Sequence, residues 1–374
     1  MKIIVAPDKF KGSLTSMQVC EAIKTGIHEV FPSADVLLFP MADGGDGFDE
    51  VLQYYLQTET ITCDTVDPLL RPIHATYQLN TFSKTAMIAL SSASGLVLLK
   101  DEECNPMYTT TFGSGLMIKH AIEQGAKKII LGLGGSATND AGIGILEALG
   151  FQLVDIKGDL ISHVGGNLQT IHRIIPPAFI PPINFQIACD VENILFGKGG
   201  ASFIYAKQKG ASSDDIIYLN KGLEHIAKII SSQTGRSIGN IPGTGAAGGV
   251  AAGLMAFFDC DIISGTKLIL EASNILEKMV GANLIITGEG KFDSQSSNGK
   301  VIEHISKLGN QFEVPVIALC GITDVSQSEI LDSGLTAAYQ LVNGGISQQF
   351  AIANAEKLLI QLSQSVLNSF FCSP

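Results

Sequence analysis

Short apolar runs and helical patterns alternate at the start of the chain. Ile3–Val5 is a β-branched run that stops at Pro7, which predicts a short buried strand. Thr15 and Gln18 have the spacing of a helix capping box, so a helix is expected to begin there. The apolar residues of that helix recur at helical spacing: Val19, Ile23, Ile27 and Val30. Val36–Phe39 predicts a second strand, and the chain therefore opens with a β-α-β unit.

The carboxyl-terminal part of the chain returns to the same alternation. Apolar runs predict three buried strands, within Asn283–Gly290, Val314–Gly321 and Leu335–Val342. Helical patterns lie between and after them, and the last one runs from about Ser347 to Phe371. Two strands at the front and three at the back predict one doubly wound parallel sheet that a long insertion interrupts.

Between these two parts the pattern changes, from about Thr60 onward. Thr62–Asn80 and Thr85–Leu96 predict paired strands and turns, which marks the start of a second domain. Lys127–Gly150 then predicts a strand, a glycine turn and a helix, and the proline-rich segment Arg173–Phe185 predicts a surface linker.

The composition is typical of a globular α/β protein with two domains. The chain has 374 residues, of which 46% are hydrophobic and 16% are charged, so it can bury a large core and is not a disordered segment. Its 36 acidic residues outnumber its 24 basic residues, which gives a net charge of -12. Because binding to nucleic acid needs clustered cations against the phosphate backbone, nucleic acid is not an expected partner.

Cysteines, histidines and apolar segments exclude further classes of protein. The 7 cysteines form no C-x-x-C pair and the 7 histidines form no H-x-H or H-x-x-x-H pair, so neither a zinc site nor a disulfide framework is expected. Reduced thiols indicate a cytoplasmic protein, and the first apolar run is too short for a signal peptide. Gly243–Phe258 is too short for a membrane span and is interpreted as a glycine turn before a buried helix, so no membrane is an expected partner.

A glycine-rich segment, Gly132–Gly144, follows one of the predicted buried strands. Glycine lets backbone N–H groups approach an anion at such a turn, which favours phosphate binding. The segment completes neither the Walker loop nor the dinucleotide fingerprint. A tight turn with Asn139 or Asp140 as the helix cap explains the pattern equally well, so the residues alone leave both interpretations open.

A second glycine-rich segment, Gly243–Gly253, has the same character with fewer polar residues. Here the close packing of a helix through small residues is favoured over phosphate binding. Asp43 and Asp46 enclose a glycine turn after another predicted strand. Their carboxylates suit Mg²⁺, and an Asx-rich turn is the alternative interpretation of the same residues.

Charged residues follow several other predicted strands: Asp8, Lys9, Lys11, Asp190, Lys291 and Asp293. Phosphoryl transfer needs a cation that offsets phosphate charge and a carboxylate near the attacking hydroxyl. No G-x-S-x-G elbow supports a serine nucleophile. The set therefore favours phosphoryl transfer, with solvated loops and surface lysines as the alternative.

A series of sequence blocks extends from residue 3 to about residue 301: IVAPDKFKGSLT, PMADGGDGF, SSASGL, TTTFGSG, GLGGSATNDAGIGILEALG, CDVEN, QKGAS, GTGAAGGVAAGL and GEGKFDSQSSNGKV. In this order they resemble bacterial glycerate kinases of the type I family, and the resemblance covers essentially the whole chain. It implies a flavodoxin-like (Rossmann-like) doubly wound sheet in residues 1–64 plus 285–374. An inserted second α/β domain, residues 65–284, would interrupt that sheet, with the active-site cleft between the two domains.

The resemblance also implies the reaction, which is transfer of the γ-phosphate of ATP to a hydroxyl of D-glycerate with Mg²⁺ as cofactor. The residues expected to bind ATP are Gly134, Gly135, Ser136, Thr138, Gly243, Gly245 and Gly248. The residues expected to bind glycerate are Asp8, Asn139 and Asp140, and the expected metal ligands are Asp43 and Asp46. The expected catalytic residues are Asp190, Asp293, Lys291, Lys9 and Lys11. D-glycerate and ATP are the expected partners, and a homodimer is one option for the oligomeric state.

The resemblance leads to a hypothesis about individual roles. Lys9 or Lys11 would neutralise the glycerate carboxylate or the γ-phosphate, and Asp190 or Asp293 would accept the proton of the attacking hydroxyl. Positions that depart from the family pattern include Asp46, Phe48, Ala89 and Ile194, and they affect substrate placement more than the reaction class. A nucleotide-dependent oxidoreductase and a non-catalytic metabolite-binding protein are the alternative functions.

Overall fold

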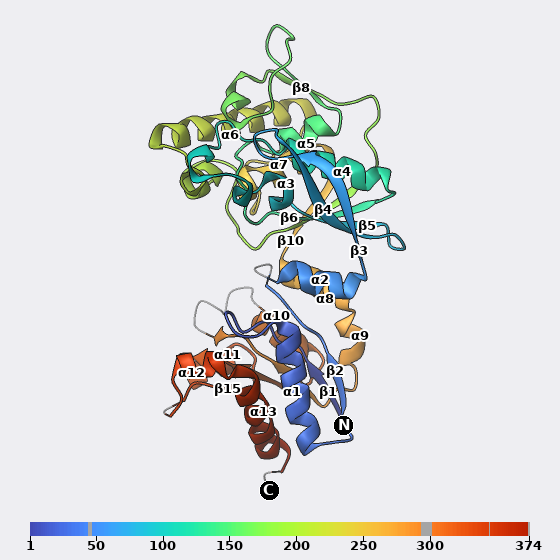
Figure 1. Cartoon of the computed structure of the whole chain (residues 1–374), viewed down its shortest axis with the longest axis vertical. Helices are drawn as coiled ribbons and strands as arrows, with labels where there is room; N and C mark the ends of the chain where they lie inside the picture. Colours follow the sequence, from blue (N-terminus) through green and yellow to red (C-terminus); the bar gives the residue numbers. More distant parts are fainter. Residues whose placement is uncertain (44–46, 293–300, 344, 373–374) are drawn as a thin grey trace. The chain divides into compact units, whose positions relative to one another are not determined.

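The structure is a computed structural model that describes residues 1–43, 47–292, 301–343 and 345–372. The internal contacts of the chain divide it into two compact units. The terminal unit consists of Met1–Leu56 together with Ser264–Pro374, and the inserted unit consists of Gln57–Ile263. Both ends of the chain therefore belong to the terminal unit, as Figure 1 shows.

The terminal unit is built on a five-stranded sheet. Its strands, in spatial order, are β15 (Ala337–Gln340), β13 (Val316–Cys320), β11 (Leu284–Thr287), β1 (Lys2–Val5) and β2 (Asp35–Leu38). Every neighbouring pair is parallel. Numbered along the chain, the order is 2-1-3-4-5, which is the flavodoxin-like doubly wound arrangement. The predicted fold class is thus confirmed, and the point where the strand order reverses lies between β1 and β11.

Helices and one small sheet complete the terminal unit. The helices are α1 (Ser16–Val30), α2 (Phe48–Leu56), α8 (Gly265–Ser273), α9 (Ile275–Met279), α10 (Val301–Gln311), α11 (Gln327–Asp332), α12 (Gln348–Ala353) and α13 (Ala355–Cys372). The small sheet pairs β12 (Lys291–Phe292) with β14 (Ile322–Thr323). At the start of α1, the Thr15 side chain accepts from Gln18 N and the Gln18 side chain accepts from Thr15 N, so the predicted capping box is confirmed.

The single helix predicted from about Ser347 to Phe371 is wrong in one respect. The structure has two helices there, α12 and α13, which meet at Asn354. The Asn354 backbone is not helical, and its side chain donates a hydrogen bond of 3.0 Å to the Phe350 backbone oxygen. An asparagine side chain that bonds to a nearby carbonyl competes with the helical pattern, which explains the break.

The inserted unit is built on a six-stranded mixed sheet. Its strands, in spatial order, are β10 (Asp259–Ile263), β9 (Asn184–Ala188), β6 (Lys128–Gly132), β5 (Thr85–Ala89), β4 (Pro72–Asn80) and β3 (Glu59–Val66). The four strands from β10 to β5 are parallel, whereas β4 is antiparallel to both β5 and β3. The paired strands predicted after Thr60 are therefore confirmed.

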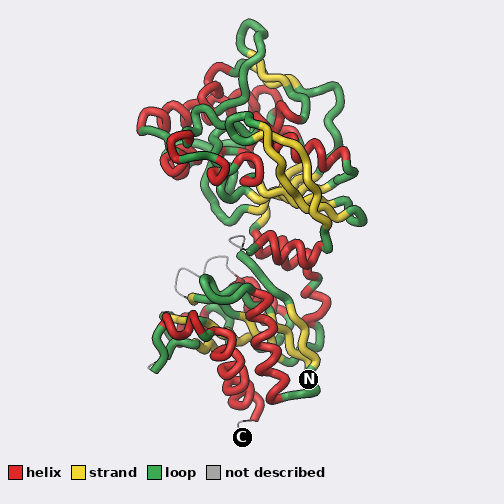
Figure 2. The backbone as a smooth tube through the Cα atoms, viewed as in Figure 1, coloured by secondary structure: helices red, strands yellow, loops and turns green. Residues whose placement is uncertain are grey.

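The other elements of the inserted unit lie around this sheet. The helices are α3 (Ser91–Ser94), α4 (Phe112–Glu123), α5 (Ile143–Ala148), α6 (Ser213–Thr234) and α7 (Val250–Phe257). A small antiparallel pair is formed by β7 (Gln152–Val154) and β8 (Arg173–Ile175). Short helical turns are η1 (Leu96–Leu98), η2 (Asp101–Glu103), η3 (Gly165–Thr170), η4 (Ser202–Ala206), η5 (Lys207–Lys209) and η6 (Ala246–Gly248). Figure 2 shows the strands of each unit in yellow and the helices in red.

The unit boundaries differ from those expected at residues 64/65 and 284/285. They lie at Leu56/Gln57 and at Ile263/Ser264. The expected first boundary would cut β3, which pairs with β4 along its whole length. The expected second boundary would assign α8 to the insertion, but the Thr266 hydroxyl in α8 donates to the Ala42 backbone oxygen of the terminal unit. Pattern changes in the sequence locate domain boundaries only approximately, because a strand can belong to either sheet.

Other sequence predictions are settled by local structure. The segment predicted as a proline-rich linker begins with β8, so that prediction is wrong for Arg173–Ile175. Gly243–Phe258 forms a buried turn followed by α7, as predicted. Among the helices that the structure describes, none combines the length and the apolar character that crossing a membrane requires. Each unit has its own hydrophobic core, which fits a protein of two domains.

Candidate functional site

The glycine-rich segment predicted to bind phosphate lies at the carboxyl edge of the sheet in the inserted unit. Residues 133–142, here called the glycine loop, connect β6 to α5. Gly132 at the end of β6 pairs with Ala188 at the end of β9. Asp190 follows Ala188 by two residues and is exposed. The structure therefore brings the glycine loop and Asp190 to the same edge of one sheet, where parallel α/β proteins bind ligands.

The exposed part of the glycine loop is narrow. Gly134 and Gly135 are exposed, and a Cβ at position 134 would have nothing within 4 Å. The Ala137 backbone N–H donates to the Ser94 backbone oxygen at 2.8 Å, and the Gly135 oxygen accepts from Leu96 N at 2.9 Å. The N–H of Ala137 is thus already used within the protein. Anion binding by backbone groups would therefore depend on the exposed Gly134 and Gly135.

Asp140 is an internal anchor of the glycine loop. Its carboxylate is fully buried. One oxygen accepts from the backbone N and the hydroxyl of Thr111, at 2.8 Å each, and the other accepts from Gly142 N at 3.1 Å. Burial raises the pKa of the Asp140 carboxyl, and these hydrogen bonds oppose that rise. Contact between Asp140 and a substrate stays a prediction, because the internal hydrogen bonds alone explain the residue.

Thr138 and Asn139 carry buried polar atoms that lack protein partners. Asn139 Oδ1 accepts from the Ser202 hydroxyl at 3.2 Å. Asn139 Nδ2 and Thr138 Oγ1 are buried and have no hydrogen-bond partner among the residues that the structure describes. Buried polar atoms are nearly always paired in folded proteins, so these two atoms are candidate ligand contacts.

Lys209 lies beneath the glycine loop, and sequence reasoning missed it. Its side chain is buried, with 2% exposure, and Nζ donates to Ser136 Oγ at 2.8 Å and to the Thr138 backbone oxygen at 2.6 Å. Burial lowers the pKa of Lys209 to about 7, and Asp140 partly offsets this effect. The block QKGAS contains Lys209, but nothing in its spacing indicates that this lysine, and not the neighbouring Lys207, turns inward.

The second glycine-rich segment packs directly on the glycine loop. A Cβ at Gly248 would lie 2.2 Å from the Thr138 backbone oxygen, and a Cβ at Gly245 would lie 2.2 Å from the Ile194 backbone oxygen. The Ala141 N–H donates to the Gly248 oxygen at 2.9 Å. Packing alone therefore requires glycine at 245 and 248. A contact of Gly243, Gly245 or Gly248 with ATP stays a prediction.

In the terminal unit, charged residues gather where the strand order reverses. Asp8 follows β1, and its backbone N–H donates to the Gly288 oxygen after β11 at 2.8 Å. The Asp8 and Glu289 side chains are both buried, with 6% and 7% exposure. Two buried carboxylates at the carboxyl ends of neighbouring parallel strands are typical of a ligand site. Sequence reasoning noted the loop around Glu289 but did not select this residue, although a carboxylate between two glycines was the available signal.

Two pockets of the terminal unit contain predicted site residues. One, of about 100 Å³, is lined by Asp8, Lys9 and Glu50 among others. The other, of about 250 Å³, is lined by Lys11 and Lys291 together with apolar side chains. The structure thus separates the predicted lysines into two neighbouring sets, both at the carboxyl ends of the strands.

The predicted metal site is only partly described. Asp43 is half-buried after β2, whereas Asp46 lies outside the described residues, as does the predicted catalytic residue Asp293. Within the described part of the chain, no three side chains of the His, Cys, Asp or Glu type gather closely enough to hold a metal by themselves.

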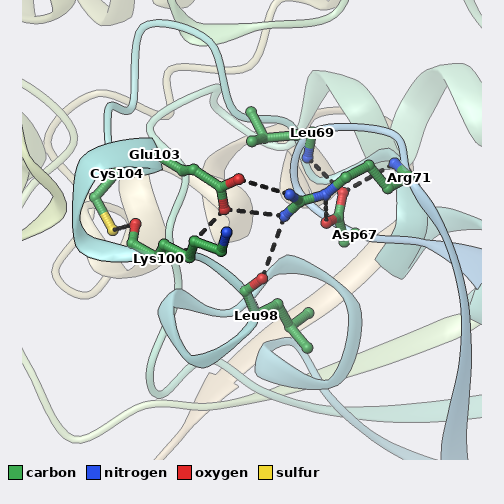
Figure 3. A network of polar contacts seen from close by, with 7 residues as sticks. All are labelled: Asp67, Leu69, Arg71, Leu98, Lys100, Glu103 and Cys104. Atoms are coloured by element: carbon green, nitrogen blue, oxygen red, sulfur yellow. Dashed lines mark hydrogen bonds and ion pairs between the residues drawn. The ribbon is translucent and has the colours of Figure 1, made fainter.

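A separate polar network in the inserted unit serves the fold (Figure 3). Arg71 Nε donates to Asp67 Oδ2 at 2.5 Å, and its guanidinium donates to both Glu103 oxygens, at 2.7 and 3.2 Å. The Arg71 guanidinium and the Lys100 backbone N–H lower the pKa of Glu103. The network joins the turn between β3 and β4 to η1 and η2, because Arg71 also donates to the Leu98 oxygen. None of the predicted site residues belongs to it.

The chain is similar in sequence and structure to known glycerate kinases. Residues 3–370 match the profile of the Glycerate kinase family. Glycerate kinase of Halalkalibacterium halodurans is 39% identical over 368 residues, which is 97% of each chain. Glycerate 2-kinase of Escherichia coli is 38% identical over 345 residues, 91% of each chain. A crystal structure from Salmonella typhimurium LT2, of a protein assigned as glycerate kinase 2, matches with a TM-score of 0.86 and 33% identity over 99% of this chain and 98% of that chain.

Proposed function

Because the chain belongs to the glycerate kinase family, we propose that it is of the bacterial type I and uses the glycine loop to bind the phosphates of ATP. The chain is an ATP-dependent kinase that acts on a hydroxyl of glycerate, as its relatives are. The observation that carries the proposal is the pairing of Gly132 with Ala188, which sets the start of the glycine loop beside the strand that leads to Asp190.

The phosphate site consists of the exposed front of the glycine loop. The exposed residues Gly134 and Gly135 leave room for an anion, since a Cβ at position 134 would have nothing within 4 Å. Backbone N–H groups in such a turn form a concave anion site. Ser136 and Thr138 follow in the loop and are buried. The Thr138 hydroxyl has no protein partner among the described residues. For Gly243, Gly245 and Gly248 we propose a supporting role, in which they hold the glycine loop from behind.

Glycerate binds through its carboxylate and hydroxyl groups, which require cations and hydrogen-bond donors. Lys9 and Lys11 follow β1 and supply positive charge for the carboxylate or for the γ-phosphate. The buried Asp8 carboxylate accepts from Lys9 N at 2.6 Å, which fixes the start of this segment. Asn139 Nδ2, a buried donor without a protein acceptor among the described residues, suits a glycerate oxygen.

Asp43 is the described residue of the proposed Mg²⁺ site. Ala42, the residue before Asp43, lines a pocket that is also lined by Asp8 and Glu50. Mg²⁺ needs only one or two carboxylates when phosphates and water complete its octahedron. Asp43 and Asp46 are therefore assigned as its protein ligands, directly or through water. When bound, Mg²⁺ would neutralise part of the phosphate charge.

Proton transfer and charge compensation are the remaining tasks of the chain. Asp190, exposed at the sheet edge, or Asp293 accepts the proton of the attacking hydroxyl. A carboxylate is sufficient because the transition state is loose and the hydroxyl needs aiming more than strong activation. Lys291 begins β12 on the terminal unit and offsets the charge that develops on the transferred group.

A reducing compartment is proposed for the enzyme. The six cysteines whose side chains the structure describes are free thiols, which supports a reducing compartment such as the cytoplasm. The homodimer stays a prediction, and light scattering on the purified protein would measure the oligomeric state.

An ADP-release assay tests the proposed function. Purified protein with ATP, Mg²⁺ and D-glycerate is expected to release ADP, and reactions without glycerate or with L-glycerate serve as controls. ³¹P NMR of the product then assigns the phosphorylated hydroxyl. If no ADP is released above the glycerate-free control, the kinase assignment is wrong, and an NADH titration would test the oxidoreductase alternative.

A further inference from the structure

We propose that Lys209 is a positioning residue for ATP, which holds the Ser136–Thr138 part of the glycine loop from beneath and places one buried positive charge behind the bound phosphates. The inference rests on the proposed function, since it takes the glycine loop as the phosphate site. Neither the resemblance nor the sequence pattern assigns a role to this lysine.

Among the described residues, the Lys209 ammonium forms hydrogen bonds with the glycine loop alone. Nζ donates to Ser136 Oγ at 2.8 Å and to the Thr138 backbone oxygen at 2.6 Å. The residue between these two, Ala137, is held from another side, because its N–H donates to the Ser94 oxygen. The lysine therefore fixes the loop at two points that flank Ala137, one and three residues after the exposed Gly135.

The charge of Lys209 lacks a direct counterion. The side chain is 2% exposed, and its two acceptors are a hydroxyl and a carbonyl oxygen, both neutral. Among the described residues it forms no ion pair, and Asp140 acts on it only as a nearby charge. A buried ammonium without a paired anion is costly, so proteins keep one mainly where an anionic ligand compensates it. ATP brings such an anion to the exposed side of the same loop.

The backbone next to Lys209 is held by close packing and by a hydrogen bond. A Cβ at Gly210 would lie 1.8 Å from the Cys104 backbone oxygen, so only glycine permits this approach. The Ala211 N–H donates to the Ala206 oxygen at 3.1 Å. The backbone that carries Lys209 is therefore held close to Cys104, and Lys209 is buried whereas Lys207, two residues earlier, is exposed.

Unpaired polar atoms beside the lysine support a ligand at this place. Thr138 Oγ1 and Asn139 Nδ2 are buried and have no partner among the described residues. Lys209 bonds to the backbone of Thr138, and Asn139 is the next residue in the chain. The Lys209 ammonium and the Thr138 hydroxyl suit phosphate oxygens, whereas the adjoining Asn139 amide is the donor proposed above for glycerate.

The test compares the kinetics of Lys209→Met with those of the matched control Lys207→Met. For Lys209→Met, KM for ATP is expected to rise about tenfold, since the variant removes both hydrogen bonds to the loop and the buried positive charge. KM for glycerate is expected to stay close to the wild-type value, and Lys207→Met is expected to match the wild type in every constant. A merely structural role would lower the amount of active enzyme, hence the apparent kcat, without this selective change in KM for ATP. An unchanged KM for ATP in Lys209→Met would overturn the inference.

A second variant decides the question if Lys209→Met loses its circular dichroism signal. Ser136→Ala keeps the ammonium and its bond to Thr138, so the fold is expected to persist, and KM for ATP is expected to rise several-fold. Ethylammonium added to Lys209→Ala fills the place of the missing amine and is expected to lower KM for ATP again. If Ser136→Ala keeps the wild-type KM for ATP, the inference is wrong. These results are distinct from failure of the proposed function, in which wild-type protein itself would release no ADP with D-glycerate.

Discussion

The backbone oxygen of Thr138 lies 2.2 Å from the position that a Cβ of residue 248 would occupy. Thr138 belongs to the glycine loop and Gly248 to the second glycine-rich segment, so two motifs far apart in the sequence share one contact. The Lys209 ammonium bonds to the same oxygen from another direction. The position of the loop therefore depends on residue 248 having no side chain.

Gly248→Ala is expected to destabilise the inserted unit and to impair the kinase reaction. The added methyl group must displace the Thr138 peptide, in a backbone with φ +68 that also disfavours alanine by about 1 kcal/mol. The clash adds to this amount, so a loss of about 3 kcal/mol or more is expected from urea unfolding. KM for ATP is expected to rise as well.

The control for Gly248→Ala is Gly235→Ala. Gly235 has a similar φ of +73, but a Cβ there would have nothing within 4 Å. This variant measures the backbone strain alone, at about 1 kcal/mol, and is expected to keep wild-type kinetics. Equal urea midpoints for the two alanine variants would contradict the clash.

The stability of the inserted unit is expected to depend on the protonation of Lys209. The pKa of Lys209 is about 7 in the folded protein, against an ordinary value of 10.5. Below pH 7 both states carry the proton, so the full cost of the buried charge applies. Between these two pKa values the unfolded chain binds more protons, so the free energy of unfolding rises with pH, by up to about 1.4 kcal/mol per pH unit.

Urea unfolding at pH 7 and pH 9 measures this effect. The wild-type midpoint is expected to rise relative to that of Lys209→Met, which has lost the titrating group. Lys207→Met, with its exposed amine removed, is expected to follow the wild type at both pH values. Parallel midpoints for wild type and Lys209→Met would show that the buried amine does not titrate in this range.

Asp140→Asn separates the anchoring of the loop from contact with substrate. An amide can accept at only one oxygen, so either the Thr111 pair of donors or the Gly142 N–H loses its acceptor. An unsatisfied buried donor costs about 1–3 kcal/mol, which urea unfolding would detect. Asp155→Asn, in a turn between β7 and β8, is the control and is expected to lose less. A tenfold rise in KM for glycerate without a loss of stability would instead favour a direct substrate contact, at about 1.4 kcal/mol of binding energy.

The sequence predicted the doubly wound sheet because its strands are apolar runs that each end in a breaker or an acid. It also located the strand ends that carry candidate chemistry. It could not predict the contact of Gly248 with Thr138, which depends on how two loops meet in space. It could not identify Lys209 either, because burial of one lysine among QKGAS depends on the Gly210 contact with Cys104. Nor could it predict that Asp140 is buried, because the hydrogen bonds that stabilise the buried carboxylate come from Thr111, which is distant in the sequence.

Asp190→Asn is expected to lower kcat and leave the fold unchanged. Asp190 is exposed at the carboxyl end of β9, so the substitution disturbs no core packing. If its carboxylate is the proton acceptor, kcat is expected to fall by about 10²- to 10⁴-fold. Glu192→Gln, exposed on the same loop, serves as the control with wild-type kcat. Wild-type turnover of Asp190→Asn would transfer the role to Asp293, and loss of turnover in Asp293→Asn would then confirm that assignment.

Removal of Mg²⁺ tests the remaining assignment of Asp43. Chelation with EDTA is expected to abolish ADP release, and added Mg²⁺ is expected to restore it, because phosphate charge is otherwise uncompensated. Asp43→Asn removes one charged oxygen ligand and is expected to raise the Mg²⁺ concentration for half-maximal rate by about tenfold. Glu21→Gln, on the exposed side of α1, is the control for a general change in acidity. If Asp43→Asn responds to Mg²⁺ as the wild type does, Asp43 is not a ligand, and the buried carboxylates Asp8 and Glu289 become the next residues to substitute.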